Sequence, residues 1–388
     1  MDYTTQKLGF KIKKALRYMR LYGPSRTLVK IKGQYHMKKR FDPLPALPER
    51  IEDGGHVGLI GCGNFAFSNI AYYLHKKYDR VMRGAMDIDL HKAASLYEKY
   101  GLRYYTDDAE KIINDPAIDL IYIASNHASH AEYAIQALKA GKHVHIEKPH
   151  VVREEQLERL CAAMAESKGR VGLGFNRPMS RMGRAIMECL AAQDGPAMFN
   201  WFIAGHEIAP EHWYFKPEEG GRVLGNLCHW TDFVLQMVAP ENRYPLTITP
   251  TRGEKSDCDI AVTYVFGDES IAAITFSAKG HTFEGVRERF AAHRGNALIS
   301  MDDFKTLTIE VVEKKRRIAP LFRDHGHREN ILRSYEMARP TADAGAQGCS
   351  IEYVWETGNL FLKTREALEQ NRPITIHGYA ASKKNGPA

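Results

Sequence analysis

The chain has 388 residues, 44% hydrophobic and 26% charged, and this length predicts more than one domain because single hydrophobic cores stop growing below it. The net charge of +7 is concentrated at the N-terminus, since residues 1–50 hold 13 Lys/Arg against 3 Asp/Glu and the remainder is slightly acidic; we therefore expect no nucleic-acid partner. The six cysteines are scattered, with no Cys-x-x-Cys pair, which argues against a metal site or disulfide framework and predicts a cytoplasmic protein.

Two basic amphipathic segments and a linker open the chain. Residues 7–22 predict a helix with four apolar side chains on one face: Leu8, Ile12, Leu16 and Met19. Ser25 is expected to cap a second helix over residues 26–40, although alternation there also allows a strand. Three prolines in residues 41–50 predict a stiff linker. Residues 1–40 then have three interpretations: a peripheral anchor on the inner membrane surface, a clasp on a neighbouring subunit or partner enzyme, or helices packed on the protein's own body.

Strands and helices alternate from residue 56 onward. The predicted strands are 56–60, 81–86, 117–124, 142–146 and 170–175. The predicted helices are 64–77, 90–100, 107–114, 130–140 and 154–167. Alternation at this spacing is typical of a parallel sheet covered on both faces, so we expect an α/β Rossmann domain over residues 51–176.

The pattern changes after residue 176. Helices are expected at 181–193, 230–238 and 351–370. Strand-like runs joined by short turns predict a mostly antiparallel sheet: 197–204, 247–250, 260–266, 270–277, 287–292, 297–300, 306–312 and 373–376. The second, α/β domain is therefore placed at residues 177–378, with a frayed tail over 379–388.

A glycine pattern directly after the first strand predicts a dinucleotide site. Gly61 suits a tight turn, Gly63 lets backbone approach a pyrophosphate, and Ala66 keeps the following helix close to the strand. The start of that helix, at Asn64 and Phe65, is expected to present N–H groups to the phosphates.

Asp87 ends the second strand, where a carboxylate can bind both ribose hydroxyls. It would repel a 2′-phosphate, and no Arg or Lys directly follows it, which favours NAD over NADP. The alternative interpretation is a solvated turn carboxylate.

Four segments together resemble the Gfo/Idh/MocA oxidoreductases, named for glucose–fructose oxidoreductase, inositol dehydrogenase and a rhizopine-catabolism protein. They are HVGLIGCGNFA, IYIASNHASHAEYAIQALKAGKHVHIEKPH, GLGFNRP and EEGGRVLGNLCHWTDF. The resemblance covers about residues 55–377 and implies a Rossmann domain followed by an α/β domain with a large open antiparallel sheet. It also implies NAD(P) chemistry on sugars, inositols or nucleotide sugars, and a homodimer or homotetramer formed through the sheet. The segment AGHEIAPEHWYFKPEEGGRVLGNLCHW is most similar to members from surface-polysaccharide and nucleotide-sugar pathways.

The resemblance also assigns catalytic positions. Lys148 falls on the catalytic lysine of a Glu-Lys-Pro motif, and His229 and Asp232 fall on the family's histidine and the carboxylate after it. Many members carry an acid four residues before the histidine, but this chain has Gly225 there, with Asn226 one step along. The identity of the acid/base group is therefore open.

A second departure lies after the third predicted strand. The family's usual Thr-Pro-Asn reads Ser125-Asn126-His127 here, which puts His127 near the nicotinamide or substrate. His130 and Glu147 are further expected cofactor neighbours, although His130 could instead cap a helix.

Hydride transfer from a carbinol needs a base for the hydroxyl proton and a positive group for the developing alkoxide. Lys148 can supply the positive charge, or act as base if its pKa falls, whereas His229 is the better base by intrinsic pKa. Asp232 either orients His229 or caps its helix.

Seven residues besides Lys148 and His229 are candidates to contact substrate: Asn176, Arg177, His206, His212, Trp213, Asn226 and Asp232. Interface packing is the competing interpretation of the His206–Trp213 loop. We expect an NAD-dependent oxidoreductase acting on a sugar or nucleotide sugar. The alternatives are a hydrolase or epimerase that retains and recycles NAD, and a non-catalytic NAD-binding scaffold that uses the basic arm.

Overall fold

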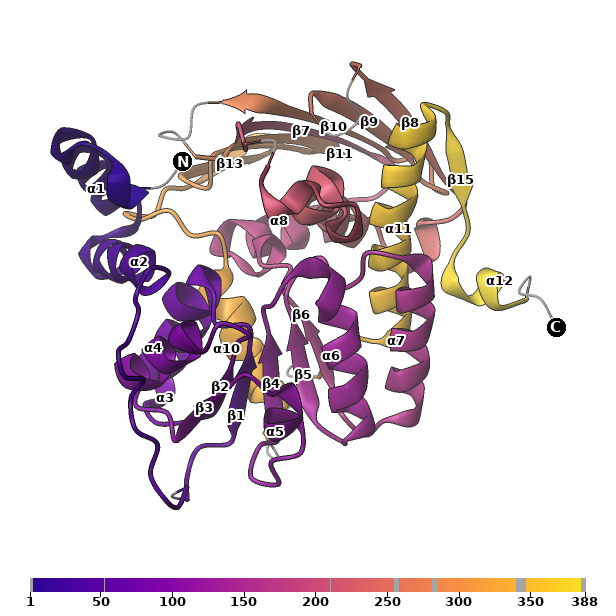
Figure 1. The fold of residues 1–388 in the computed structure, drawn as a ribbon. Coiled ribbons are helices and arrows are strands. Elements are labelled where there is room, and N and C mark those ends of the chain that lie inside the picture. The colour runs from indigo at the N-terminus through magenta and orange to yellow at the C-terminus, as the bar shows by residue number, and fades with distance from the viewer. Residues whose placement is uncertain are drawn as a thin grey trace. The chain divides into compact units, whose positions relative to one another are not determined.

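The computed structural model describes residues 3–51, 53–209, 211–254, 258–280, 285–339 and 347–384, and the chain divides into two compact units (Figure 1). The Rossmann unit comprises Asp2–Gly174 and His327–Val354. The sheet unit comprises Phe175–Gly326 and Trp355–Ala388. The predicted boundary near residue 176 matches the first crossing between the units, but residues 327–354 belong to the Rossmann unit rather than to the second domain.

The Rossmann unit is built on a six-stranded sheet of order β3-β2-β1-β4-β5-β6. Its strands are β1 (Val57–Ile60), β2 (Met82–Met86), β3 (Tyr104–Thr106), β4 (Leu120–Ile123), β5 (His143–Ile146) and β6 (Val171–Leu173). All are parallel, and β1, β2 and β4 are buried along their whole length. Strand order reverses between β1 and β4, so ligands are expected beyond the carboxyl ends of these two strands.

Helices flank this sheet as the apolar periodicity predicts. They are α3 (Ala71–Tyr78), α4 (Leu90–Tyr100), α5 (Ala109–Ile113), α6 (His127–Lys139), α7 (Glu154–Glu166) and α10 (His327–Met337), with the π-helix η2 (Ala66–Ile70) ahead of α3. The Asp89 and Asp108 side chains accept N–H groups at the starts of α4 and α5. The strands and helices predicted between residues 56 and 175 are confirmed, but β3 and α10 were not predicted.

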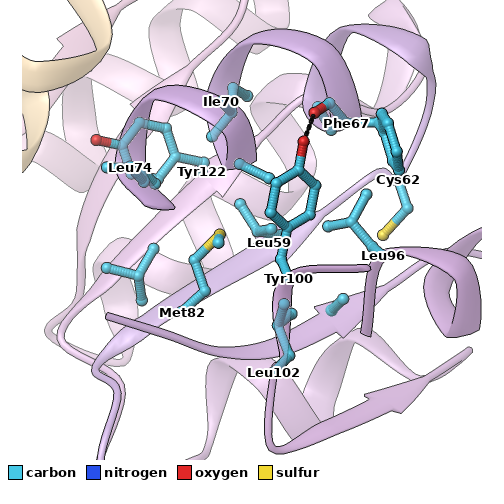
Figure 2. Close-up of a cluster of buried hydrophobic side chains, with 14 of the residues drawn as sticks. Leu59, Cys62, Phe67, Ile70, Leu74, Met82, Leu96, Tyr100, Leu102 and Tyr122 are labelled. Atoms are coloured by element: carbon cyan, nitrogen blue, oxygen red, sulfur yellow. Dashed lines mark hydrogen bonds between the residues drawn. The ribbon is translucent and has the colours of Figure 1, made fainter. Parts of the chain in front are cut away.

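A hydrophobic cluster fills one side of the Rossmann sheet (Figure 2). Leu59 of β1 and Met82 of β2 face side chains from the helices above them, among them Leu74 and Leu96. Tyr100 lies in this cluster and donates its hydroxyl to the carbonyl of Phe67 at 2.7 Å, so its one polar group is satisfied.

Helix α10 returns to this sheet from far along the chain. Tyr122 donates to the carbonyl of Ile331 at 2.7 Å, Asn330 donates to the carbonyl of Leu173 at 2.9 Å, and Ser334 lies 2.7 Å from His145 Nδ1. The segment HRENILRSYEM has few apolar residues, so its periodicity was too weak to predict a helix, and its tertiary hydrogen bonds have no local signal.

The sheet unit holds nine strands in the order β14-β13-β12-β11-β7-β10-β9-β8-β15. They are β7 (Ala197–His206), β8 (Leu246–Arg252), β9 (Ile260–Val265), β10 (Ile271–Gly280), β11 (Arg287–Arg294), β12 (Ala297–Asp302), β13 (Thr306–Val311), β14 (Lys314–Ile318) and β15 (Ile374–Ile376). The sheet is antiparallel except for the β7–β10 pair, which is parallel, and β14 was not predicted. Burial alternates along strands such as β12, as in a sheet with one covered face.

The sheet unit also contains α8 (Arg181–Ala191) and α9 (Cys228–Met237), while α11 (Ile351–Gln370) carries the last crossing between the units. A short helix, α12 (Tyr379–Lys384), occupies the first part of the predicted frayed tail, so that prediction is wrong for these six residues. Residues 385–388 lie outside the described ranges.

The N-terminal arm forms two helices, α1 (Leu8–Tyr22) and α2 (Pro24–His36), and the strand alternative for the second segment is wrong. Gly23 occupies the N-cap of α2 and Pro24 its first turn, so Ser25 is not the cap. No helix within the described ranges is long and apolar enough to cross a membrane.

Helix α2 packs on the Rossmann unit, as the third interpretation of the arm expected. Arg26 donates to the Ser68 carbonyl and to Asn69 Oδ1. His36 is buried, with Nδ1 2.9 Å from Ser95 Oγ and Nε2 2.7 Å from the carbonyl oxygen of Cys62.

We predict that His36→Ala lowers the free energy of unfolding by about 1–3 kcal/mol, because it leaves a buried carbonyl without its partner. Urea or thermal denaturation of the full chain measures the change. His293→Ala, at an exposed position of β11, is the matched control. Equal stability of the two variants would show that the contacts of His36 do not hold the arm in place.

Candidate functional site

The predicted site residues fall into two groups, one in each unit. The first group surrounds the loop after β1. Gly61 adopts φ +88° and donates its N–H to the Met86 carbonyl at 2.8 Å. A Cβ at Gly61 would lie 2.4 Å from the amide nitrogen of Ser125, so no other residue fits this close approach of β1 to the end of β4.

Gly63 is different, because a Cβ added there meets no atom within 4 Å. The backbone of the loop therefore borders open space at this residue, which is what a phosphate approaching along the main chain requires. Ala66 is buried at the start of the π-helix η2, and Phe65 lies edge-on to His327, with 5.5 Å between ring centroids.

Asp87 is fixed at the end of β2. Its Oδ2 accepts the Cys62 N–H at 2.8 Å and its Oδ1 accepts the Asp89 N–H at 2.9 Å. Each carboxylate oxygen keeps a second lone pair, so both can still accept a ribose hydroxyl. These two contacts argue against the alternative of a freely solvated turn carboxylate.

The loop after β4 carries the second predicted motif. Asn126 is exposed and caps α6, and its Oδ1 accepts the Ser129 hydroxyl at 2.6 Å. Ser125 Oγ also lies 2.7 Å from Ser129 Oγ. His127, the first residue of α6, is buried, so its ring is held by the protein rather than by solvent.

His130 ties this loop to the segment that carries the lysine. Its Nδ1 lies 2.8 Å from the carbonyl oxygen of Pro149 and its Nε2 lies 3.2 Å from that of Ser125. Burial lowers the pKa of His130 despite the pull of these carbonyls, so the ring is neutral at pH 7. Its role in the structure is to position the residues around Lys148, not to cap the helix.

Lys148 follows β5 between two buried side chains. Glu147 turns into the protein, with Oε1 3.2 Å from His145 Nε2, so its carboxylate faces a histidine of its own strand. His150 lies 3.0 Å from the carbonyl of Val354, and burial lowers its pKa to about 3. These anchors hold the backbone on either side of Lys148, whose own side chain is half-buried.

The second group of residues lies in the sheet unit, around the π-helix η6 (Val223–Leu227) and α9. Asn226 and His229 are three residues apart, which places them on one helical face, and both are half-buried. Within the described part of the chain, the buried Oδ1 of Asn226 has no hydrogen-bond partner. Single π turns of this kind occur often at functional sites.

Arg177, an expected substrate contact, is held by side chains of its own unit. Its guanidinium forms a bidentate ion pair with Glu288 at 2.7 and 2.8 Å and stacks 4.5 Å above the Trp230 ring. Trp230 Nε1 donates to the same carboxylate at 2.8 Å. The arginine, the carboxylate and the indole are all buried, so the guanidinium is engaged within the protein, and its contact with substrate stays a prediction.

The Asp232 carboxylate also makes hydrogen bonds within the protein. It is fully buried and accepts hydrogen bonds from Thr357 at 3.0 Å and from Gln236 at 2.7 Å. The bond from Thr357 joins α9 to α11, and the bond from Gln236 lies within α9, so the predicted contact of Asp232 with substrate gains no support from the geometry. Asn176 is likewise buried and donates to the carbonyl of His325 at 2.6 Å.

The loop after β7 gathers aromatic rings at the surface. His212 accepts the N–H of Tyr214 at 3.3 Å, and the rings of Trp213 and Tyr214 meet edge to face at 4.6 Å. Trp213 is 38% exposed, so one face of this cluster remains open to a ligand. His206, at the end of β7, is half-buried, and its carbonyl accepts from Arg222 at 2.9 Å.

Three neighbours of the site were missed from sequence. His145 could have been found, because residues two apart on a strand share a face and it precedes Glu147 by two. Tyr214 adjoins the predicted Trp213. His36 gave no signal, since its contact with Cys62 spans 26 residues. In the described ranges no group of three or more His, Cys, Asp or Glu side chains could hold a metal ion.

Comparison with known proteins agrees with this geometry. Residues 56–175 match the model of an oxidoreductase family with an NAD-binding Rossmann fold. Myo-inositol 2-dehydrogenase of Thermotoga maritima is 26% identical over 67% of this chain and 78% of its own length. Oxidoreductase P35 of Formosa agariphila is 30% identical, but the match spans only 31% of this chain and 37% of that protein. Levoglucosan dehydrogenase, solved with NADH and levoglucosan, shares the fold at a TM-score of 0.71 and 16% identity, over 84% of this chain and 100% of that one.

The two loop glycines should respond differently to a side chain. We predict that Gly63→Val leaves the melting temperature unchanged but weakens NAD binding at least about tenfold, because it fills the open space where phosphate approaches. Gly61→Ala should instead lower the melting temperature, because its Cβ meets the backbone at the end of β4. Thermal shift with and without NAD measures both effects. Unchanged NAD affinity in Gly63→Val would remove the pyrophosphate site from this loop.

Proposed function

We propose that the chain is a member of the Gfo/Idh/MocA oxidoreductase family and acts as an NAD-dependent dehydrogenase on a sugar or nucleotide sugar. The observation that carries this proposal is the arrangement at the carboxyl ends of the Rossmann strands. Three features follow strands of this one sheet. Gly63 borders open space after β1, the Asp87 carboxylate is held by backbone N–H groups after β2, and Lys148 follows β5 with anchored backbone on either side.

NAD is the cofactor that this loop suits best. Bound NAD would supply the hydride acceptor, its pyrophosphate against the loop at Gly63 and its adenosine ribose against Asp87. The Asp87 carboxylate is already held by two backbone N–H groups, so it would stay close to a 2′-phosphate and repel it. The preference for NAD over NADP rests on that repulsion.

Lys148 and His229 have separate roles in the reaction: one stabilises negative charge and the other accepts a proton. As the carbinol C–H transfers its hydride, the O–H proton must leave and the C=O bond forms. We assign the proton to His229, because an imidazole is the side chain best suited to act as a general base at neutral pH. The Lys148 ammonium stabilises the negative charge that develops on the oxygen.

Asn226 takes the place of the acid that many relatives carry. Its buried Oδ1 is an acceptor without a protein partner among the described residues, and a substrate hydroxyl would satisfy it. The exposed rings at His212–Tyr214 can stack on a sugar face. The inositol and levoglucosan dehydrogenases among the similar proteins favour a polyol or free sugar, and the resemblance noted in the sequence adds nucleotide sugars as a second class to test.

The outer face of the large sheet supports a homo-oligomer. Met198 and Phe202 of β7 and Leu298 of β12 are 57%, 48% and 54% exposed. They alternate with buried side chains such as Trp201 and Ile299, so they share the face turned away from the core. Apolar side chains gathered on one open sheet face mark an association surface.

The test of the proposal is net formation of NADH. Thermal shift against a panel of nucleotide sugars and free sugars, with NAD present, identifies a ligand, and absorbance of the reduced nicotinamide then follows turnover. Net NADH supports a dehydrogenase. Product without net NADH would instead indicate a hydrolase or epimerase that recycles its cofactor, and binding without product a non-catalytic scaffold.

We expect Lys148→Met to lower kcat at least about 10²-fold, because the alkoxide loses its positive partner, while NAD binding stays nearly intact. Lys139→Met, on an exposed position of α6, controls for loss of a lysine in the same unit. Near-normal turnover in Lys148→Met would exclude Lys148 as a catalytic residue.

A double-mutant cycle tests whether Lys148 and His229 serve one proton transfer. His229→Asn alone should lower kcat about 10²-fold, because the reaction loses its general base. Adding Lys148→Met should then cost much less than it does in the wild-type chain, since residues acting as a unit are not additive. Fully multiplicative losses would mean that the two side chains act in separate steps.

A further inference from the structure

Helix α1 carries an apolar surface that the described part of the chain leaves exposed. None of its fifteen residues is buried. Leu8, Ile12, Leu16 and Met19 are 71%, 50%, 49% and 41% exposed, and at about 100° per residue they form one continuous stripe along the helix. A stripe of this kind is ordinarily buried against a protein core or an interface.

The charges around the stripe identify its partner. Residues 7–22 contain six Lys or Arg and no Asp or Glu. Lys13 and Arg20 border one side of the stripe and Lys11 borders the other, as the helical angles place them. Long basic side chains beside an apolar face keep their charge at the level of lipid headgroups while the face enters the acyl boundary.

The pair of helices is crowded with positive charge even before a partner binds. Lys30 of α2 lies close to Arg26 and Lys14, and burial together with these like charges lowers its pKa to about 8. An anionic surface would relieve this repulsion. A second copy of α1 would increase it, because each helix would carry five positive charges and no negative ones, so self-association through α1 is disfavoured.

The arm is also held firmly enough to act as an attachment. Helix α2 is bound to the Rossmann unit through Arg26 and His36, and α1 contacts α2. The exposed stripe is therefore carried by a docked helix and not by a loose tail. A membrane bound at α1 would hold the Rossmann unit at its surface.

We propose that α1 is a monotopic membrane-binding helix that docks this protein on an anionic lipid bilayer through Leu8, Ile12, Leu16 and Met19 and their flanking cations. Attraction of the cations to anionic headgroups brings the helix to the surface, and burial of the stripe holds it there.

Flotation of the full chain with lipid vesicles tests the proposal. Wild type should float with vesicles that contain phosphatidylglycerol and remain behind with pure phosphatidylcholine. Ile12→Glu/Leu16→Glu should reduce the floated fraction at least about tenfold, because two side chains of the stripe become charged. Leu321→Glu/Phe322→Glu makes the same charge change at two exposed apolar residues elsewhere and should float as wild type.

A second pair of variants isolates the charges. Lys13→Glu/Arg20→Glu should also lose flotation at low salt, and its difference from wild type should shrink at high salt, because salt screens the attraction that the two cations provide. Lys314→Glu/Arg317→Glu on the exposed strand β14 should float as wild type. Unchanged NAD thermal shifts show that each variant is folded, so failure here is separable from failure of the dehydrogenase assignment. The proposal is overturned if wild type stays in solution, if it floats equally with neutral vesicles, or if Ile12→Glu/Leu16→Glu changes only the oligomeric state.

Discussion

The turn at Gly61 and Cys62 is the constraint on which the Rossmann site depends. Gly61 brings the end of β1 so close to the end of β4 that a Cβ would lie 2.4 Å from the Ser125 nitrogen. The next residue is then held from both sides, since the Cys62 N–H is bound by Asp87 and its carbonyl by His36. The backbone proposed to face phosphate, the carboxylate proposed to bind ribose and the N-terminal arm therefore meet at two consecutive residues. None of them can move without disturbing the other two.

The same contacts give the N-terminal arm a physical role next to the loop after β1. A helix from the N-terminus closes the outer side of a loop whose inner side faces a cofactor, because Gly33 packs against Asn64 and His36 reaches the Cys62 carbonyl. The π-helix that follows the loop also accepts Arg26 at Ser68 and Asn69. The arm thus contributes to the shape of the site although none of its residues was a candidate to touch a ligand.

Patterns of neighbouring residues predicted the strands, the helices and the turn at Gly61, but they did not predict contacts between residues far apart in the chain. Apolar periodicity located nearly every strand and helix between residues 56 and 175, and the glycine motif located the turn at Gly61. Helix α10 was missed because its contacts, such as Tyr122 with the Ile331 carbonyl, join residues far apart in the chain. The ion pair of Arg177 was missed for the same reason, since the position of Arg177 after β6 is visible in the sequence but its partner Glu288 is 111 residues away.

The discontinuity of the Rossmann unit bears on how this protein can have evolved. Because α10 supplies Asn330 and Ser334 to the sheet at β5 and β6, the chain must leave the unit near residue 174, return near 327 and leave again near 354. A single genetic crossover would therefore separate β5 and β6 from part of their own packing. Exchange of cofactor-binding halves between relatives needs two coordinated crossovers, so point substitution in the sheet unit is the simpler route to a new substrate.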